Sequence, residues 1–207
     1  MLHRGFSRSY LKLTSNLSAK YGLINALKRV STNRLLMNFI ASLPTSRAAW
    51  LTLAASALVL EICALFFQYF LNLAPCIMCI YQRTAVLGLV FCAVSAINPQ
   101  QVLLRVFGYL CWAISAFWGW SIANEHIAMQ QNTNPFAFSC EVVPNFPSFM
   151  PLHQWIPSFF EATGDCGEIS WSFLGMSMPG WMQIIFAVYS IAFVVVLLTR
   201  LLVKKSV

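Results

Sequence analysis

Four long apolar runs, separated by short polar stretches, dominate the pattern of the chain. They cover residues 48–70, 80–97, 102–122 and 181–203. Each run approaches the roughly 20 residues that a helix needs to cross the hydrocarbon layer of a membrane. The second run is short and contains Arg83, so we expect it to be tilted or to hold Arg83 near one membrane surface. The pattern predicts an all-α membrane protein, a bundle of four transmembrane helices.

The composition agrees with a membrane protein. Of the 207 residues, 59% are hydrophobic and 9% are charged, and the mean hydropathy is +0.70. These values exclude an ordinary soluble domain of this size. The net charge of +7 does not indicate a nucleic-acid partner, because the basic residues flank the apolar runs and form no separate face. Membrane lipid is the expected surrounding.

The distribution of charge predicts the orientation. Of the thirteen basic residues, eight precede the first run and three more end the fourth, whereas five of the six acids lie between the third and fourth runs. Short loops rich in Lys and Arg stay in the cytoplasm. Both termini are therefore expected inside, and the long loop 123–180 is expected outside. With four crossings, the turn that holds Cys76 and Cys79 lies outside as well.

This organisation gives three parts. Residues 1–47 form a basic N-terminal arm, residues 48–203 form the transmembrane domain with the loop 123–180, and residues 204–207 form a cytoplasmic tail. The arm has no acid and resembles in composition either a membrane-surface segment or an organelle transit peptide. Translation from Met37, which would leave out the first 36 residues, is a third possibility.

The seven cysteines fall into two groups. Three lie inside the apolar runs, where a cysteine usually packs as a small apolar side chain: Cys63, Cys92 and Cys111. Four lie on the expected outer side: Cys76, Cys79, Cys140 and Cys166. If that side faces an oxidising compartment, pairs of these cysteines form disulfides.

Cys76 and Cys79 stand where the second apolar run begins. Pro75 suits the first position of a helix, and thiols at a helix N-terminus are favoured as reactive thiolates. Arg83 follows Cys79 by one helical turn and so lies on the same face, deeper in the membrane. An arginine at mid-bilayer costs about 2.5–3.5 kcal/mol, which indicates a polar partner inside the membrane. The alternative is that Arg83 extends to the lipid headgroups.

Cys140 and Cys166 flank a 25-residue segment of the long loop. Spacing alone favours a structural disulfide for this pair. A zinc site of all four outer cysteines is a further alternative, although the second pair lacks the C-x-x-C spacing and an oxidising compartment opposes four free thiolates. We therefore expect no metal.

A short helix is expected within this segment, on the membrane surface. Its apolar residues fit one helical face: Leu152, Trp155, Ile156, Phe159 and Phe160. Pro157 interrupts the pattern, so the element is expected to consist of two pieces.

Four stretches resemble the bacterial disulfide bond formation protein B (DsbB) family. They are "LEICALFFQ" in the first run, "PCIMCIYQR" at the second, "NEHIAM" after the third, and the loop from "PFAFSC" through "GDCGEISWSFLGMSMPGW". The resemblance covers roughly residues 40 to 200 in order. It implies a quinone-dependent thiol:disulfide oxidoreductase of the bacterial inner membrane, whose partner is a periplasmic DsbA-like oxidase of the thioredoxin fold.

The resemblance also implies roles for the four outer cysteines. The reduced partner attacks a Cys140–Cys166 disulfide and forms a mixed disulfide with Cys140. Cys166 and Cys76 then relay between the two loops, and Cys79 passes two electrons to a quinone, either ubiquinone or menaquinone. The resemblance therefore implies a redox-active disulfide between Cys140 and Cys166, in place of the structural disulfide that spacing alone favours.

Three further residues gain roles at the quinone by resemblance. Arg83 stabilises charge on the quinone oxygens, and His126, beside Glu125, helps to supply protons.

Gln82 departs from the family, because its best-known members carry an acid there. Glu61 matches an acid of the family, and we expect it to be protonated or to face another helix.

Two alternatives to this function stay open. One is a related enzyme dedicated to a particular partner, similar to DsbI. The other is a membrane scaffold with two structural disulfides and no enzymatic activity.

Overall fold

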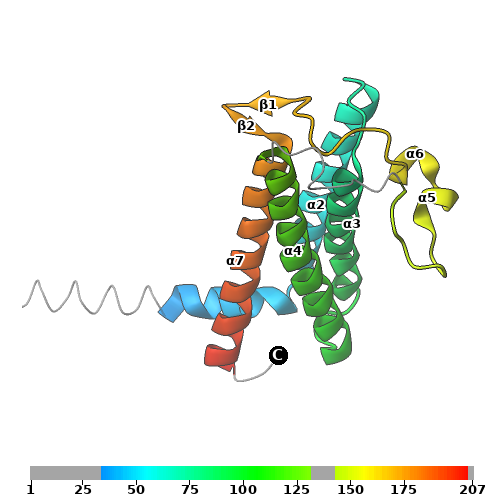
Figure 1. The fold of residues 1–207 in the computed structure, drawn as a ribbon. Helices are drawn as coiled ribbons and strands as arrows, with labels where there is room; N and C mark the ends of the chain where they lie inside the picture. The colour runs from blue at the N-terminus through cyan, green and yellow to red at the C-terminus, as the bar shows by residue number, and fades with distance from the viewer. Residues whose placement is uncertain (1–33, 132–142, 205–207) are drawn as a thin grey trace, which may run out of the picture.

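The computed structural model describes residues 34–131 and 143–204. Its four long helices form a bundle: α2 (Arg47–Tyr69), α3 (Ile77–Phe91), α4 (Val102–Gln131) and α7 (Met178–Lys204) (Figure 1). The 3₁₀ helix η2 (Cys92–Ala96) continues α3. All four are long and apolar enough to cross a membrane. The predicted all-α bundle of four spans is confirmed.

The helices extend three or more residues beyond the apolar runs at three ends. α3 begins at Ile77 instead of residue 80, α4 continues from residue 122 to Gln131, and α7 begins at Met178 instead of residue 181. Hydropathy marks the part of a helix that suits lipid, whereas backbone hydrogen bonding continues into polar sequence. The extensions of α3, α4 and α7 all lie at one end of the bundle and form the walls of a site there.

Small residues allow the helices to pack closely. α4 packs against both α3 and α7, and α2 packs against α3. A Cβ atom added to Gly88 of α3 would lie 2.1 Å from the Ser115 hydroxyl oxygen of α4. One added to Gly119 of α4 would lie 2.3 Å from the buried Phe186 ring of α7. Close packing of this kind drives helix association in lipid, where the hydrophobic effect between helices is missing.

Aromatic side chains fill the opposite half of the bundle. The Trp50 ring contacts Tyr109 and Trp112 edge to face, with centroid distances of 5.7 and 6.3 Å. Phe193 of α7 completes the cluster. The Trp50 indole donates to the Pro44 carbonyl at 2.9 Å, so its polar atom is satisfied. This half is built mainly of apolar side chains, whereas Cys76, Cys79 and Cys166 lie at the other end of the bundle.

The remaining elements are short. Residues 34–42 are helical and lie across the bundle, followed by η1 (Leu43–Thr45) (Figure 1). In the loop before α7, α5 (Leu152–Trp155) and α6 (Pro157–Phe160) are separate helices, as Pro157 predicted.

A hairpin between α6 and α7 was not predicted. β1 (Ser172–Phe173) pairs antiparallel with β2 (Met176–Ser177) through a turn in which Leu174 and Gly175 have φ values of 52° and 77°. Strands of two residues are too short to produce an alternating pattern.

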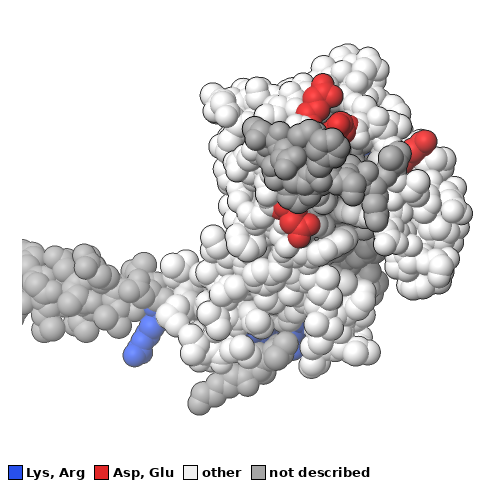
Figure 2. All heavy atoms as spheres, in the orientation of Figure 1, with Lys and Arg blue, Asp and Glu red and all other residues white. Residues whose placement is uncertain are grey.

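Charged side chains separate along the bundle. Figure 2 shows the acidic groups around the end that carries the hairpin and the basic groups toward the other end. The loop between α2 and α3 and the loop between α4 and α7 both leave from the acidic end. The two cysteine-bearing loops therefore lie on one side of the bundle, as expected.

Candidate redox site

Cys76 and Cys79 sit at the first turn of α3. Cys76 is the N-cap, and its sulfur accepts a hydrogen bond from the Cys79 backbone N–H at 3.3 Å. The two sulfurs are 2.8 Å apart. Pro75 precedes the N-cap, so the expectation that it occupies the first helical position is wrong. The cap is made by a thiol in the place where a hydroxyl or carboxylate is usual.

Backbone hydrogen bonds bring the second loop to the first. The N–H groups of Thr163 and Gly164 both donate to the Pro75 carbonyl, at 2.9 and 3.0 Å. A Cβ atom on residue 164 would lie 2.4 Å from the Ala74 carbonyl oxygen, so only glycine admits this approach. The segment that follows carries Cys166, which is 1% exposed and packs in one cluster with Cys76.

The contact between Cys166 and Cys76 changes the chemistry of the N-cap thiol. The pKa of Cys76 is raised above its ordinary value. The largest cause is hydrogen bonding with the Cys166 sulfur, followed by hydrogen bonding with Cys79 and by burial. The two neighbouring sulfurs and burial therefore oppose the thiolate at Cys76, against the effect of the helix N-terminus.

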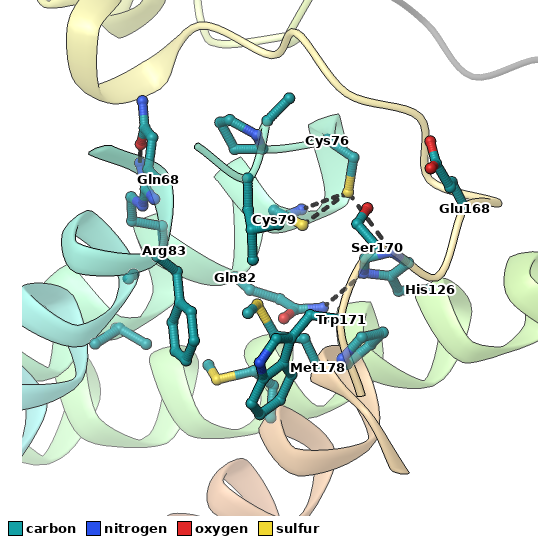
Figure 3. Close-up of a pocket in the computed structure, with 18 of the residues that line it drawn as sticks. Gln68, Cys76, Cys79, Gln82, Arg83, His126, Glu168, Ser170, Trp171 and Met178 are labelled. Atoms are coloured by element: carbon teal, nitrogen blue, oxygen red, sulfur yellow. Dashed lines mark hydrogen bonds between the residues drawn. The ribbon is translucent and has the colours of Figure 1, made fainter. Parts of the chain in front are cut away.

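Arg83 lies one turn deeper along α3 and is 6% exposed. One of its terminal nitrogens donates to the Gln68 side-chain oxygen at 2.7 Å and to the Phe159 carbonyl at 2.8 Å. The Phe159 ring lies 4.9 Å from the guanidinium carbon. Figure 3 shows Arg83 directed toward Gln68 at the edge of the cavity. Arg83 thus finds its polar partners inside the protein and does not extend to the headgroups.

The end of α2 holds α6 in place. The Gln68 amide nitrogen donates to the Ser158 carbonyl at 3.2 Å, and the Tyr69 hydroxyl donates to the same oxygen. Together with the Arg83 bond to Phe159, these contacts occupy carbonyls at the C-terminal end of α6 that lack helical partners. The loop position is therefore tied to the buried cation.

His126 of α4 faces Cys76 from the opposite side (Figure 3). It is 3% exposed, and its Nε2 lies 3.5 Å from the Cys76 sulfur. The Gln82 amide nitrogen lies 3.3 Å from His126 Nδ1. The two ring nitrogens of His126 therefore lie between the Gln82 amide group on one side and the Cys76 sulfur on the other.

One cavity joins these groups. It measures about 870 Å³ with the solvent space at its mouth. Apolar side chains form much of its wall, among them Leu60, Phe67 and Val86. Polar groups converge on it from three helices: Glu61, Cys79, Gln82, Arg83 and His126. A quinone needs a slot for an apolar ring and donors for two carbonyl oxygens, and this set of residues fits that need.

One expected site residue, Glu125, is not brought to this cavity. Glu125 is exposed on α4 and is not among the residues that line it. Its neighbour His126 points inward instead, since adjacent helical residues face different directions. Cys140 lies outside the described residues.

Several lining residues had no assigned role in the sequence. Gln68 and Glu61 are seven positions apart in an apolar run, a spacing that puts both on one face of α2. That polar face was the signal for a partner of Arg83. Trp171, just before β1, and Met178, the first residue of α7, also line the cavity, and no local pattern marks them (Figure 3).

The ligand atoms of Cys76, Cys79 and His126 lie within 4.8 Å of one another, which is close enough for one metal ion. The absence of a metal from the working protein stays a prediction, which metal analysis of the purified protein tests.

Adjoining thiols from two loops, beside a cavity inside a four-span bundle, define the class of membrane thiol oxidoreductases. Comparison with known proteins specifies the family. The profile of the family "Disulfide bond formation protein DsbB" matches residues 46–196. The chain belongs to the DsbB family.

Named relatives agree. Disulfide bond formation protein B of Pseudoalteromonas translucida is 56% identical over 171 residues, which is 82% of this chain and 99% of the relative. The protein of the same name from Pseudoalteromonas atlantica is 51% identical over 83% of this chain and 100% of the relative. That of Aeromonas hydrophila is 46% identical over 80% of this chain and 96% of the relative.

The close approach at Gly164 can be tested by disulfide trapping. In a background with Cys79 and Cys140 replaced by alanine, mild oxidation should join Cys76 to Cys166. Gly164→Ala should lower the yield about tenfold, because relieving such an overlap costs about 1–3 kcal/mol. Peptide mapping under non-reducing conditions measures the yield.

Gly167→Ala is the matched control, because a Cβ atom there meets only an Asp165 oxygen at 3.5 Å. An equal yield in the Gly164→Ala and Gly167→Ala variants would show that the glycine does not place Cys166.

Proposed function

We propose that this protein reoxidises a periplasmic DsbA-like oxidase through Cys140, Cys166, Cys76 and Cys79 and delivers the electrons to a quinone in the cavity beside Arg83. As a member of its family, it is a quinone-dependent thiol:disulfide oxidoreductase that sustains disulfide bond formation by reoxidising DsbA. The observation that supports these residue roles is the contact of Cys166 with Cys76, next to Cys79 and the cavity.

The cysteines act as a relay of disulfide exchanges. The reduced partner attacks Cys140 and frees Cys166 as a thiolate; Cys140 comes into this role by family resemblance. Cys166 then attacks Cys76 of the Cys76–Cys79 disulfide, and Cys79 leaves as a thiolate. A thiolate must reach its target sulfur in line, and the hydrogen bonds at Pro75 hold Cys166 against Cys76 for this step. The partner's second cysteine then releases the oxidised partner and leaves Cys140 as a thiolate, which attacks Cys166, reforms the Cys140–Cys166 disulfide and frees Cys76 as a thiol. Oxidation of the Cys76 thiol and the Cys79 thiolate back to a disulfide gives up two electrons toward the cavity.

Cys79, Arg83 and His126 would hold the quinone ring. When bound, the quinone accepts two electrons and two protons. Arg83 places a fixed positive charge one turn below Cys79, where it stabilises first the thiolate and then negative charge on an oxygen. Ubiquinone and menaquinone share the ring and the two carbonyl oxygens that these residues would contact.

In this proposal the protein lies in the bacterial inner membrane with both termini in the cytoplasm. The support is the enrichment of Lys and Arg before the first span and at the end of the fourth, together with the acids between the third and fourth spans. In this orientation the cavity mouth and both cysteine loops face the oxidising compartment, where the DsbA-like partner works.

A related enzyme that serves one dedicated partner would use the same site chemistry. The range of partner proteins that this protein oxidises therefore distinguishes a general enzyme from a dedicated one. A scaffold with structural disulfides gives no reason for a buried arginine and histidine to converge on two adjoining cysteines.

Cys79→Ser tests the last step of the relay. It should abolish quinone reduction driven by a reduced DsbA-like partner, because serine cannot form the disulfide, while membrane insertion stays intact. Quinone absorbance in detergent or nanodiscs measures turnover. Cys63→Ser, on an exposed face of α2, is the matched control and should keep full turnover. Undiminished turnover of the Cys79→Ser variant would refute the proposed electron path.

Labelling in intact cells tests the orientation. In a variant without its native cysteines, a single cysteine replaces either Glu168 on the cavity side or Gln100 in the loop between η2 and α4, both exposed positions. A membrane-impermeant maleimide should label the Glu168→Cys variant and leave the Gln100→Cys variant unlabelled until the cells are lysed. The reverse pattern would contradict the proposed orientation.

A further inference from the structure

Glu61 is a buried acid that the relay does not use. It lies on α2, is 4% exposed and lines the same cavity as Cys79 and Arg83. Within the described residues, neither of its carboxyl oxygens has a hydrogen-bond partner. An ionised carboxylate without hydrogen bonds is strongly disfavoured inside a membrane. An acid in this position either is neutral or exists to balance a charge.

A structural ion pair with Arg83 does not account for Glu61. Paired carboxylates and guanidinium groups hydrogen-bond at about 2.7–2.9 Å, often through two parallel bonds. The Arg83 Nε and Glu61 Oε2 atoms are 3.9 Å apart and form no hydrogen bond. Arg83 instead bonds to the neutral oxygens of Gln68 and Phe159. Glu61 therefore lies close enough to Arg83 for an electrostatic interaction, and its carboxyl oxygens can still hydrogen-bond to another group.

We propose that Glu61 is the carboxylic acid that donates the second proton to the quinone, a role that rests on the proposed function. The Cys79 thiolate and the Cys76 thiol form their disulfide and give up two electrons and one proton. Glu61 supplies the other proton and becomes a carboxylate. The quinone takes both electrons and both protons and departs as the neutral hydroquinone. Before the step, the Cys76 thiol and Glu61 carry the two protons and Cys79 carries the negative charge. After the step, the hydroquinone carries both protons and Glu61 carries the negative charge.

This exchange keeps the charge beside Arg83 constant. Before the step the guanidinium faces the Cys79 thiolate, and Glu61 is neutral. Afterwards the sulfurs are neutral, and Arg83 faces the Glu61 carboxylate at the observed separation of 3.9 Å. In a medium of low dielectric, an arginine left with no negative neighbour would be costly. Glu61 replaces the thiolate as the counter-charge at the moment when the thiolate is consumed.

The cavity supplies a return path for the proton. Besides Glu61, the polar residues that line it include Gln130 and Ser170, together with Asp165 and Glu168, which are exposed. Figure 3 shows Ser170 and Glu168 on the segment that leads into the hairpin. Polar side chains along an open cavity can hold water that carries protons. Glu61 is thus reprotonated from the side on which the cysteine loops lie.

The experiment compares Glu61→Gln with Glu61→Asp, and with Glu161→Gln as a control on an exposed loop residue outside the cavity. Single-turnover quinone reduction should fall about 100-fold in Glu61→Gln, which is the low end of the effect of a general acid, and recover in part in Glu61→Asp. Glu161→Gln should match the wild type. Disulfide exchange with the reduced partner without quinone should be unchanged in all three, which shows that they are folded.

A second readout needs no turnover. In the reduced, quinone-free protein at neutral pH, the infrared spectrum should contain the C=O stretch of a protonated carboxylic acid that disappears in Glu61→Gln. Absence of this band from the wild type, or quinone reduction at the wild-type rate in Glu61→Gln, overturns the assignment. Failure of the proposed function is distinguishable, because it appears as turnover that survives loss of Cys79.

Discussion

A positive charge buried in the membrane-spanning part of the chain needs partners, and the partners of Arg83 organise the site. The guanidinium binds Gln68 at the end of α2 and the Phe159 carbonyl in α6, so it joins two helices and the outer loop at one point. The same group lines the cavity one turn below Cys79. The cost of burying the cation is therefore offset by contacts that also fix the loop and place charge where electrons arrive.

The fit between the two loops follows from small features of the backbone. Pro75 has no N–H to donate, but its carbonyl accepts two hydrogen bonds from the second loop, and Gly164 permits the close approach. Cys166 then meets Cys76, and His126 completes the surroundings of the N-cap sulfur. The geometry favours exchange between loops, because the entering sulfur is already at its target while the leaving Cys79 faces the cavity.

The sequence was sufficient for the four spans, the shared side of the two loops and the position of Cys79 and Arg83 on one face, since these depend on local hydropathy, charge and helical period. It was insufficient wherever a contact joins distant segments. The local sequence around Cys166 does not show that Cys76 is its neighbour, which only the family resemblance implied. Glu125 was expected at the quinone because it stands next to His126, although adjacent helical residues face different directions. The raised pKa of Cys76 has the same origin, because the sulfur that raises it comes from the other loop.

The most direct test concerns Arg83. Equilibrium binding of a short-chain quinone to the protein in nanodiscs should weaken about 10- to 100-fold in Arg83→Gln, the loss expected for a hydrogen bond to a charged group, and less in Arg83→Lys, which keeps the charge. Quinone binding of unchanged affinity in Arg83→Gln, with the variant folded and competent in thiol exchange, would contradict the claim that this cation holds the electron acceptor.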